Sequence, residues 1–284
     1  MALSNTVLDV SEIAWFIRMK HGIDISRYRP TCFRRRVAHR MAMIGCETIE
    51  EYLGHLTADA SEMEKLMDVI TIHVTGFFRD RDVFDALEER HVPSLLSRGS
   101  GGGTGTLRAW SAGCSTGEEA YSIAMMLEKA ARVSAPGTKI EVFGTDVSED
   151  ACRTARAGMY GEERMEGLSS RMRSEFFRRE GDGWHAKQSL RAMVKFRPHD
   201  LFSPAPFSRL DMIFCRNVLI HFEHFVRDAV MKGFHGALLP GGFLVLGKSE
   251  VLAGDAERLF ELIDPRCKIY SKRPSDGQSR EDRR

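Results

Sequence analysis

The sequence predicts an α/β protein in which an all-helical N-terminal domain precedes a parallel β-sheet with helices on both faces. From Val10 to about Arg79 the apolar residues recur with helical periodicity, and no convincing strand interrupts them. Beyond that point, short apolar runs alternate with helical stretches. Strands that are apolar on both faces and separated by helices are typical of a parallel sheet that helices cover on both sides.

We expect the helical domain over residues 1–80, and a connecting helix with a glycine-rich linker over residues 81–106. The linker includes Gly99–Thr106, whose composition is typical of a flexible surface segment. The α/β domain follows over residues 107–284. A Gly-Asp-Gly turn at residues 181–183 lies between strand-forming flanks, and it predicts a small β-hairpin subdomain near residues 176–196.

The predicted elements of the α/β domain are defined by their apolar pattern. The strands of the main sheet are expected at residues 107–110, 139–144, 192–196, 210–215 and 242–247. The helices between them are expected at residues 118–131, 149–157 and 226–239.

The amino-acid composition limits the classes of partner that the chain is expected to bind. Hydrophobic residues make up 43% and charged residues 29%, and the net charge of +1 gives no overall attraction to nucleic acid or to a membrane surface. No apolar run approaches the length of a membrane-spanning helix, and the six cysteines include no C-x-x-C pair. We therefore expect a cytoplasmic monomer with reduced thiols, without a metal site, without membrane insertion and without a nucleic-acid partner.

Polar residues follow four of the predicted strands, at Ser111–Gly113, Asp146, Asp200 and Asn217. Such residues commonly terminate strands, so a single example carries little weight. In open parallel sheets, however, ligands bind beyond the carboxyl ends of the strands. Four polar strand ends along one edge of the sheet favour a ligand-binding edge over ordinary loop chemistry.

The segment WSAGCSTGEEAYS, residues 110–122, reads as a strand end, a tight turn and the start of a helix. It lacks the dinucleotide-binding G-x-G-x-x-G spacing and the lysine of a Walker loop. A pyrophosphate would also be repelled by Glu118 and Glu119. The segment instead favours a ligand with adenosine-like hydroxyls and a cationic group, which S-adenosylmethionine provides. Both glutamates also fit a capping box, and we expect one to cap the helix while Glu118 faces the ligand.

Five segments together resemble the CheR-type chemotaxis receptor methyltransferases: ITIHVTGFFRD, WSAGCSTGEEAYS, VFGTDVSEDA, DMIFCRNVLIHF and LLPGGFLVLGKSE. The resemblance covers the chain from about Ile13 to Ser271. It implies a doubly wound, Rossmann-like S-adenosylmethionine-dependent methyltransferase domain with a small β-subdomain, preceded by an all-α N-terminal domain. It also implies methylation of glutamate side chains on the cytoplasmic helices of chemoreceptors, with S-adenosylhomocysteine as the other product.

The resemblance assigns roles to individual residues. Those expected at the cofactor are His73, Thr75, Arg79, Gly113, Glu118, Asp146, Asp200, Leu201, Asn217 and Val218. Among them, Glu118 is expected at the amino-acid end of the cofactor and Asp146 at its ribose. The sequence departs from the family pattern at His73, where asparagine is frequent, at Asp200, where asparagine is also frequent, and at His221, where tyrosine is frequent.

Methylation of a carboxylate requires no general base, because a glutamate side chain is already ionised at neutral pH. We expect catalysis by positioning, with Arg79 neutralising a carboxylate and His221 orienting the incoming glutamate. Two other classes remain open at this point: a methyltransferase acting on RNA or on a small molecule, and a non-catalytic module that senses the cofactor.

A cluster of arginines without any acidic residue lies between Arg27 and Met43. The residues expected to dock acidic receptor helices are Arg34, Arg35, Arg36 and Arg40. A solvated surface helix or a contact with RNA would explain the same cluster, since arginines attract phosphate. The aromatic side chains that stack on bases are sparse here, which disfavours RNA.

Overall fold

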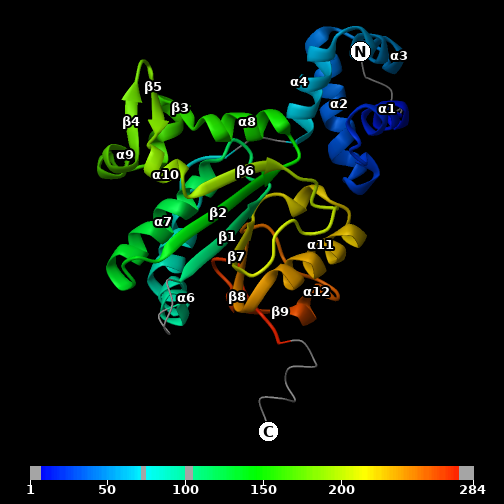
Figure 1. The fold of residues 1–284 in the computed structure, drawn as a ribbon. Helices are drawn as coiled ribbons and strands as arrows, with labels where there is room; N and C mark the ends of the chain where they lie inside the picture. The colour runs from blue at the N-terminus through cyan, green and yellow to red at the C-terminus, as the bar shows by residue number, and fades with distance from the viewer. Residues whose placement is uncertain (1–7, 72–74, 100–104, 275–284) are drawn as a thin grey trace. The chain divides into compact units, whose positions relative to one another are not determined.

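The computed structural model describes residues 8–71, 75–99 and 105–274 (Figure 1). Contacts divide the chain into two compact units. One comprises Met1–His73 with His221–Val226, and the other comprises Val74–Ile220 with Arg227–Arg284. Among the described residues, every helix is too short or too polar to cross a membrane. Thr75 and Arg79 belong to the second unit, whereas the expected domain boundary is at residue 80.

The first unit is built from helices, as predicted. They are α1 (Ser11–His21), η1 (Ile25–Arg27), α2 (Pro30–Ile44), α3 (Ile49–Ala58) and α4 (Ala60–Thr71). Gly45 ends α2 in a left-handed conformation (φ 77°), which lacks a steric penalty only for glycine. Thr48 and Glu51 form a reciprocal capping box at the start of α3. The helices bury an apolar core that includes Ile13, Ile17, Val37, Tyr52 and Leu66.

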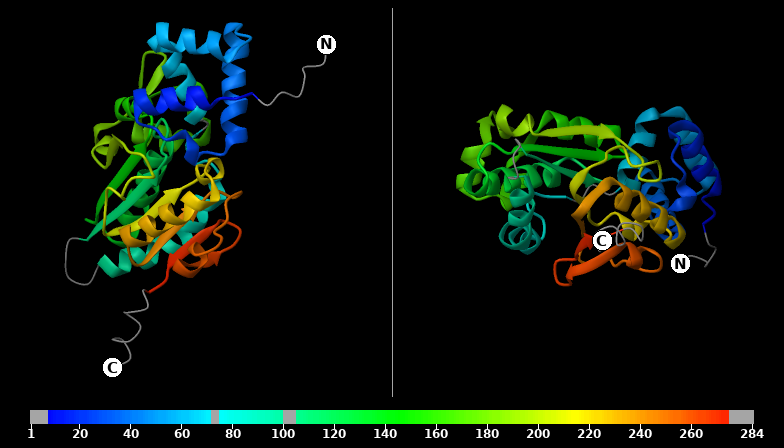
Figure 2. Two further views of the ribbon diagram at one scale, coloured as in Figure 1. Left: turned by 90° about the vertical axis from the view of Figure 1, so that its right-hand side faces the viewer. Right: turned by 60° about the horizontal axis from the view of Figure 1, so that its bottom comes forward.

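The second unit contains the predicted mostly parallel sheet, with the strand order β6-β2-β1-β7-β8-β10-β9. The parallel strands are β1 (Thr106–Ala112), β2 (Lys139–Asp146), β6 (Val194–Pro198), β7 (Leu210–Cys215) and β8 (Leu238–Leu246). The five predicted strands are therefore confirmed. Two antiparallel strands, β9 (Phe260–Asp264) and β10 (Ile269–Lys272), extend one edge of the sheet and were not predicted (Figure 2).

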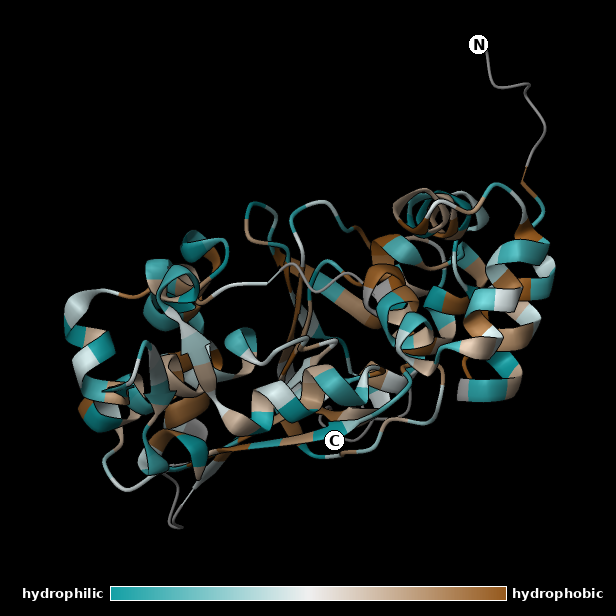
Figure 3. Ribbon diagram, turned by 90° about the horizontal axis from the view of Figure 1, so that it is seen from above, coloured by the Kyte–Doolittle hydropathy of each residue, from teal (hydrophilic) through white to brown (hydrophobic). Residues whose placement is uncertain are grey.

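The order of the strands in the sheet runs in two directions from β1. From β1 it proceeds outward through β2 to β6, and it then returns to β7 on the other side of β1 and continues to β8. The strand order therefore reverses between β1 and β7, which is the position where doubly wound sheets bind ligands. The helices shown in Figure 3 carry both hydrophilic and hydrophobic segments, as expected when one helix face packs against a neighbour.

The helices of the second unit connect these strands. In chain order they are α5 (Arg81–Ala86), η2 (Leu87–His91), α6 (Val92–Gly99), α7 (Glu118–Ser134), α8 (Glu149–Ala157), η3 (Glu162–Gly167), α9 (Ser170–Phe176), α10 (Gln188–Arg191), η4 (Leu219–His221), α11 (His224–Ala237) and α12 (Ala256–Leu259). The last residue of η4, His221, and the first residues of α11 belong to the first unit.

The β-subdomain is a three-stranded antiparallel sheet in the order β3-β5-β4. The predicted hairpin is confirmed, with β4 at Phe177–Glu180 and β5 at Gly183–Ala186. A third strand, β3 (Met159–Gly161), was not predicted. The last residues of the predicted subdomain range, from Val194 onward, belong to β6 of the main sheet instead.

Candidate functional site

The loop that follows β1 is bound to the end of β2 at the carboxyl edge of the sheet. The backbone N–H groups of Gly113 and Cys114 donate to the Thr145 carbonyl at 2.8 and 2.9 Å. The Asp146 carboxylate accepts a hydrogen bond of 2.8 Å from the Ser115 N–H. Gly113 and Asp146, both predicted to contact the cofactor, therefore lie at the ends of two adjacent parallel strands.

The loop after β7 packs directly against the same turn. Gly113 has a φ of +80°, and a Cβ atom at this position would lie 2.5 Å from Cγ2 of Val218. Only glycine accommodates both this conformation and this close approach. The structure thus brings together Gly113 and Val218, two predicted cofactor residues that are more than a hundred positions apart in the chain.

The loop after β6 joins the same edge. The His199 N–H donates to the Asp146 carbonyl at 2.8 Å, so the residues after β6 lie beside the end of β2. The Asp200 carboxylate accepts a hydrogen bond of 3.0 Å from the Phe202 N–H and closes a local turn. Asp200 and Leu201 are both partly exposed, which leaves them accessible at the edge of the sheet.

Asn217, the first residue after Arg216 in the C-R-N segment, has two unusual features. Its φ of +61° lies in the left-handed region, which is uncommon for any residue other than glycine. Its side-chain carbonyl Oδ1 is buried and has no hydrogen-bond partner among the described residues. Buried acceptors are nearly always satisfied, so this atom matches a ligand that offers a donor. S-adenosylmethionine, with its hydroxyl, amine and ammonium donors, fits such a site.

Glu118 is fully buried at the first position of α7. Its carboxylate accepts hydrogen bonds from Thr116 Oγ1 at 2.6 Å and from Arg164 Nη1 at 3.1 Å. Burial raises the pKa of Glu118, and the contacts with Thr116 and Arg164 oppose that shift. The residue predicted to face the cationic end of the ligand therefore already has one cationic partner in Arg164.

The capping boxes expected from Ser115-x-x-Glu118 and Thr116-x-x-Glu119 are not formed. The N-cap of α7 is Gly117, with a φ of 97°, and no side chain caps the helix. Glu119 instead accepts a hydrogen bond of 2.7 Å from the Ser111 hydroxyl and forms an ion pair with Arg216 at 3.2 Å. The Glu118 carboxylate interacts instead with Thr116, with Arg164 and with its own backbone N–H.

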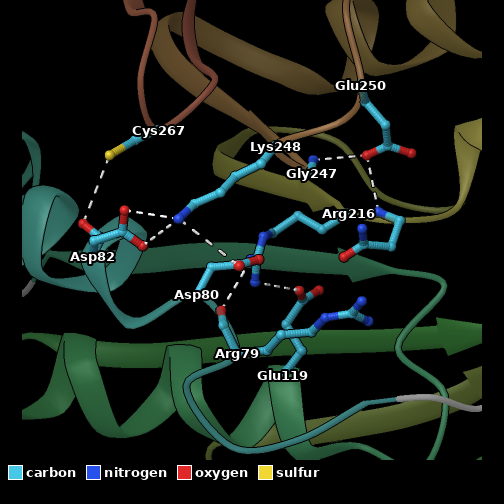
Figure 4. A network of polar contacts seen from close by, with 10 residues as sticks. Arg79, Asp80, Asp82, Glu119, Arg216, Gly247, Lys248, Glu250 and Cys267 are labelled. Atoms are coloured by element: carbon cyan, nitrogen blue, oxygen red, sulfur yellow. Dashed lines mark hydrogen bonds and ion pairs between the residues drawn. The ribbon is translucent and has the colours of Figure 1, made fainter.

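Arg216 is a central residue of the site that sequence reasoning missed. Its side chain is only 1% exposed, and its guanidinium pairs with Asp80 and Glu119 and donates to the Arg79 carbonyl at 2.9 Å (Figure 4). Arg216 therefore connects three segments: the turn before α5, the start of α7 and the loop after β7. The C-R-N motif contained the signal, but a sequence does not reveal that an arginine is buried.

The segment before α5 is held from several sides. Phe77 and Phe78 are buried, and the Phe78 N–H donates to the Ser122 hydroxyl at 2.9 Å. The Arg79 side chain is exposed while its carbonyl is bound by Arg216, and Thr75 is partly exposed. His73 lies outside the described residues.

His221, predicted to be catalytic, belongs to the helical unit. Its carbonyl accepts a hydrogen bond of 2.9 Å from the Arg29 N–H. Burial and the nearby charges of Arg36, Arg29 and Arg35 lower the pKa of His221 to about 4. The imidazole is therefore neutral at physiological pH and cannot act as a cation toward a carboxylate.

The predicted docking arginines divide into two groups. Arg35 is exposed, Arg34 and Arg36 are partly exposed, and Arg36 donates to the Val69 carbonyl. Arg40 is buried and therefore does not belong to an exposed basic face, contrary to the prediction. Its guanidinium pairs with Glu62 at 2.6 Å, and Glu62 also accepts a hydrogen bond of 3.0 Å from the Tyr52 hydroxyl. We name Arg34, Arg35 and Arg36 the basic face.

Comparison with known families matches both units of the chain. Residues 73–269 match the model of the CheR methyltransferase SAM binding domain, and residues 8–71 match the CheR methyltransferase all-alpha domain. The chain is 35% identical to a chemotaxis protein methyltransferase of Listeria monocytogenes, over 83% of this chain and 87% of that protein. It is 32% identical to chemotaxis protein methyltransferase 1 of Pseudomonas aeruginosa, over 84% of this chain and 88% of that protein.

A longer relative shows the same similarity within a larger chain. An uncharacterized 104.1 kDa protein of Rhodobacter capsulatus is 32% identical over 92% of this chain, which spans only 27% of that protein's length. Among solved structures, the crystal structure of the DszA carbon methyltransferase aligns with 63% of this chain and with 38% of its own chain, at 18% sequence identity. The TM-score of this alignment is 0.39, which is too low to support an argument. The family matches over both units confirm the resemblance and the predicted fold class, and the chain belongs to the CheR methyltransferase family.

Proposed function

We propose that this protein transfers a methyl group from S-adenosylmethionine to glutamate side chains on the cytoplasmic helices of chemoreceptors, forming glutamate methyl esters. The supporting structural observation is the carboxyl edge of the sheet, where Gly113 and Val218 are in close contact and Asn217 Oδ1 lacks a partner among the described residues. Membership in the CheR methyltransferase family supports the cofactor and the class of reaction.

The residues at this edge are those that we propose to hold the cofactor. Asp146 is the ribose ligand, Glu118 receives the α-ammonium group, and Asn217 accepts a hydrogen bond from the cofactor. The remaining proposed contacts are His73, Thr75, Arg79, Gly113, Asp200, Leu201 and Val218. When bound, S-adenosylmethionine supplies an electrophilic methyl group on its sulfonium.

The protein contributes to the reaction by positioning and by excluding water. A glutamate carboxylate is ionised at neutral pH, so no residue has to remove a proton. Holding the reacting groups in place removes most of the entropic barrier of a bimolecular step. Arg79 is proposed to neutralise a carboxylate. His221, being neutral, is proposed to orient the incoming glutamate through a single hydrogen bond and not through charge.

We propose that the basic face of the helical unit docks the substrate. Its three arginines follow one another in α2, and Arg35 is exposed to solvent. Glutamate-rich receptor helices offer the complementary charge, which favours encounter and orientation more than it adds affinity.

The test measures methyl transfer and the chemistry of the product together. The protein is incubated with S-adenosylmethionine carrying a labelled methyl group and with cytoplasmic fragments of the chemoreceptors of its own organism. Label that alkali releases as methanol identifies methyl esters, because esters hydrolyse in base whereas N-methyl groups persist. Cofactor binding without any transfer would favour the sensing module, and labelled RNA without labelled receptor would favour an RNA methyltransferase.

A further inference from the structure

Glu250 lies in the turn after β8, where its side chain is buried and is hydrogen-bonded, among the described residues, by backbone N–H groups. Its two carboxylate oxygens accept hydrogen bonds from five backbone N–H groups, shown in part in Figure 4. The donors to Oε1 are Val218 at 3.0 Å, Leu219 at 2.7 Å and Ile220 at 3.3 Å. The donors to Oε2 are Asn217 at 2.9 Å and Gly247 at 2.7 Å.

These contacts suit an ionised carboxylate, which has only acceptor atoms. A buried charge is costly unless hydrogen bonds replace its hydration, and five N–H donors do so here. Burial raises the pKa of Glu250, and the backbone N–H groups of Gly247, Asn217, Leu219 and Ile220 oppose that shift. A protonated carboxyl or an amide at this position carries hydrogen atoms of its own, and one of them would face a backbone N–H group that needs an acceptor.

The position after β8 is shaped for this carboxylate. A Cβ atom on Gly247 would lie 2.7 Å from Oε2 of Glu250 and 2.8 Å from the backbone nitrogen of Asn217. Glycine is therefore required for the carboxylate and the loop after β7 to approach each other so closely. The contact joins the carboxyl ends of two adjacent parallel strands, β7 and β8.

Four of the five donors are consecutive, from Asn217 to Ile220, and they include both proposed cofactor residues of the loop after β7. Asn217 has a left-handed backbone, which asparagine tolerates better than most residues, and its N–H is held by Glu250 Oε2. Val218 packs against Gly113. Glu250 binds the backbone N–H groups of Asn217 and Val218. It does not contact the side-chain atoms that we propose to face the cofactor.

We propose that Glu250 is a positioning residue whose ionised carboxylate holds Asn217–Ile220 in the conformation that forms the cofactor-binding wall. The identity of the ligand rests on the proposed function, whereas the clamp on the loop stands on the geometry of the protein alone. Removing the negative charge should release the loop and weaken cofactor binding, even though Glu250 touches no ligand.

The first experiment compares Glu250→Gln with the wild type by calorimetry of S-adenosylhomocysteine binding. The substitution preserves shape but places an NH₂ group against N–H donors, so we expect the dissociation constant to rise by about tenfold or more. The control is Glu257→Gln, which changes an exposed glutamate of the same region and should leave the affinity unchanged. Unchanged affinity in Glu250→Gln would overturn the proposal.

The second experiment tests whether the charge, and not only the packing, is required. Glu250→Ala leaves the N–H groups without an acceptor, and added formate or acetate should restore cofactor affinity, whereas formamide or acetamide should not. If Glu250→Ala folds only when the carboxylate is added, that selectivity supports the proposal equally. Equal rescue by acetate and acetamide would contradict it, and Glu250→Gln decides the matter if the alanine variant fails to fold with either.

A third measurement separates this inference from the proposed function. Amide hydrogen exchange at Val218, Leu219 and Ile220 in the ligand-free protein should accelerate in Glu250→Gln relative to Glu257→Gln. Unchanged exchange at these amides would overturn the clamp whatever the ligand is. A wild-type protein that does not bind S-adenosylmethionine, but shows the accelerated exchange in the variant, would instead overturn the proposed function and leave the clamp standing.

Discussion

Arg216 and Glu119 form an ion pair in the interior of the sheet unit, with Nη1 and Oε2 3.2 Å apart. Arg216 also pairs with Asp80, and Asp80 lies 3.9 Å from the Lys248 ammonium (Figure 4). The ion pair between Arg216 and Glu119 connects the start of α7 to the loop after β7. The same loop is bound through its backbone by Glu250, so carboxylates hold both the side chain of Arg216 and the backbone that follows it.

Replacement of Arg216 by methionine should lower the free energy of unfolding by about 3–5 kcal/mol, because Glu119 and Asp80 lose their shared buried cation. Urea denaturation of the purified protein measures the change. The double variant Arg216→Met/Glu119→Gln should lose less free energy of unfolding than the two single variants lose in sum, since both members of the ion pair are removed together. Strict additivity would show that the two side chains do not stabilise each other.

Glu118 and Glu119 should respond differently to removal of charge. Glu118→Gln should weaken S-adenosylmethionine binding by roughly 1.5–3 kcal/mol, the typical contribution of a charged hydrogen bond. Glu119→Gln should chiefly reduce stability, because its carboxylate is bound by Ser111 and Arg216. Calorimetry and urea denaturation on both variants give the comparison. The reverse pattern would transfer the proposed ligand role from Glu118 to Glu119.

Asp146→Ala should weaken cofactor binding by roughly 1.5–3 kcal/mol if the carboxylate binds the ribose. The structure adds a second expected effect, a loss of stability, because the same carboxylate accepts hydrogen bonds from the N–H groups of Ser115 and Ser148. The control is Asp150→Ala, at a side chain that is 42% exposed. Calorimetry that finds full affinity in Asp146→Ala would reject the ribose assignment.

Charge reversal on the basic face should separate substrate docking from cofactor binding. The double variant Arg34→Glu/Arg35→Glu should reduce methylation of receptor fragments severalfold while calorimetry finds unchanged cofactor affinity, since docking to acidic helices depends on charge. The effect should shrink at high salt. Equal loss of methylation and of cofactor affinity would mean that these arginines serve the fold.

Arg40 should behave as a structural residue. Arg40→Met leaves the Glu62 carboxylate buried without its cation, so we expect the free energy of unfolding to fall by about 3–5 kcal/mol. Chemical denaturation monitored by circular dichroism measures this loss. A variant that kept full stability but lost receptor methylation would restore Arg40 to the docking surface.

Acid should destabilise the protein through His221, whose pKa of about 4 in the folded state lies below the ordinary value of 6.5. Between these two values the unfolded chain binds more protons, so stability falls as the pH drops from 6.5 toward 4. Urea unfolding at several pH values should show a weaker pH dependence in His221→Gln than in the wild type. His39→Gln, at an exposed histidine, serves as the control.

Much of the fold follows from local pattern. Apolar runs identify β1, β2, β7 and β8 because these strands are buried on both faces toward their carboxyl ends. The edge strand β6 alternates buried and exposed residues instead. The antiparallel strands escaped prediction because β9 is largely exposed along its middle residues and lacks such a run. Periodicity also placed α8 correctly at Glu149–Ala157, where Ser148 caps the helix and Gly158 ends it.

The sequence by itself determined the helical unit, the parallel sheet and the polar residues at its strand ends, since each depends on periodicity or on a short motif. Only the tertiary structure decided which charges face each other. Arg40 reads like its neighbours in the arginine cluster but is buried against Glu62, and Glu250 gains its five donors from two separate loops. Burial and pairing arise from segments distant in the chain, so no local pattern encodes them.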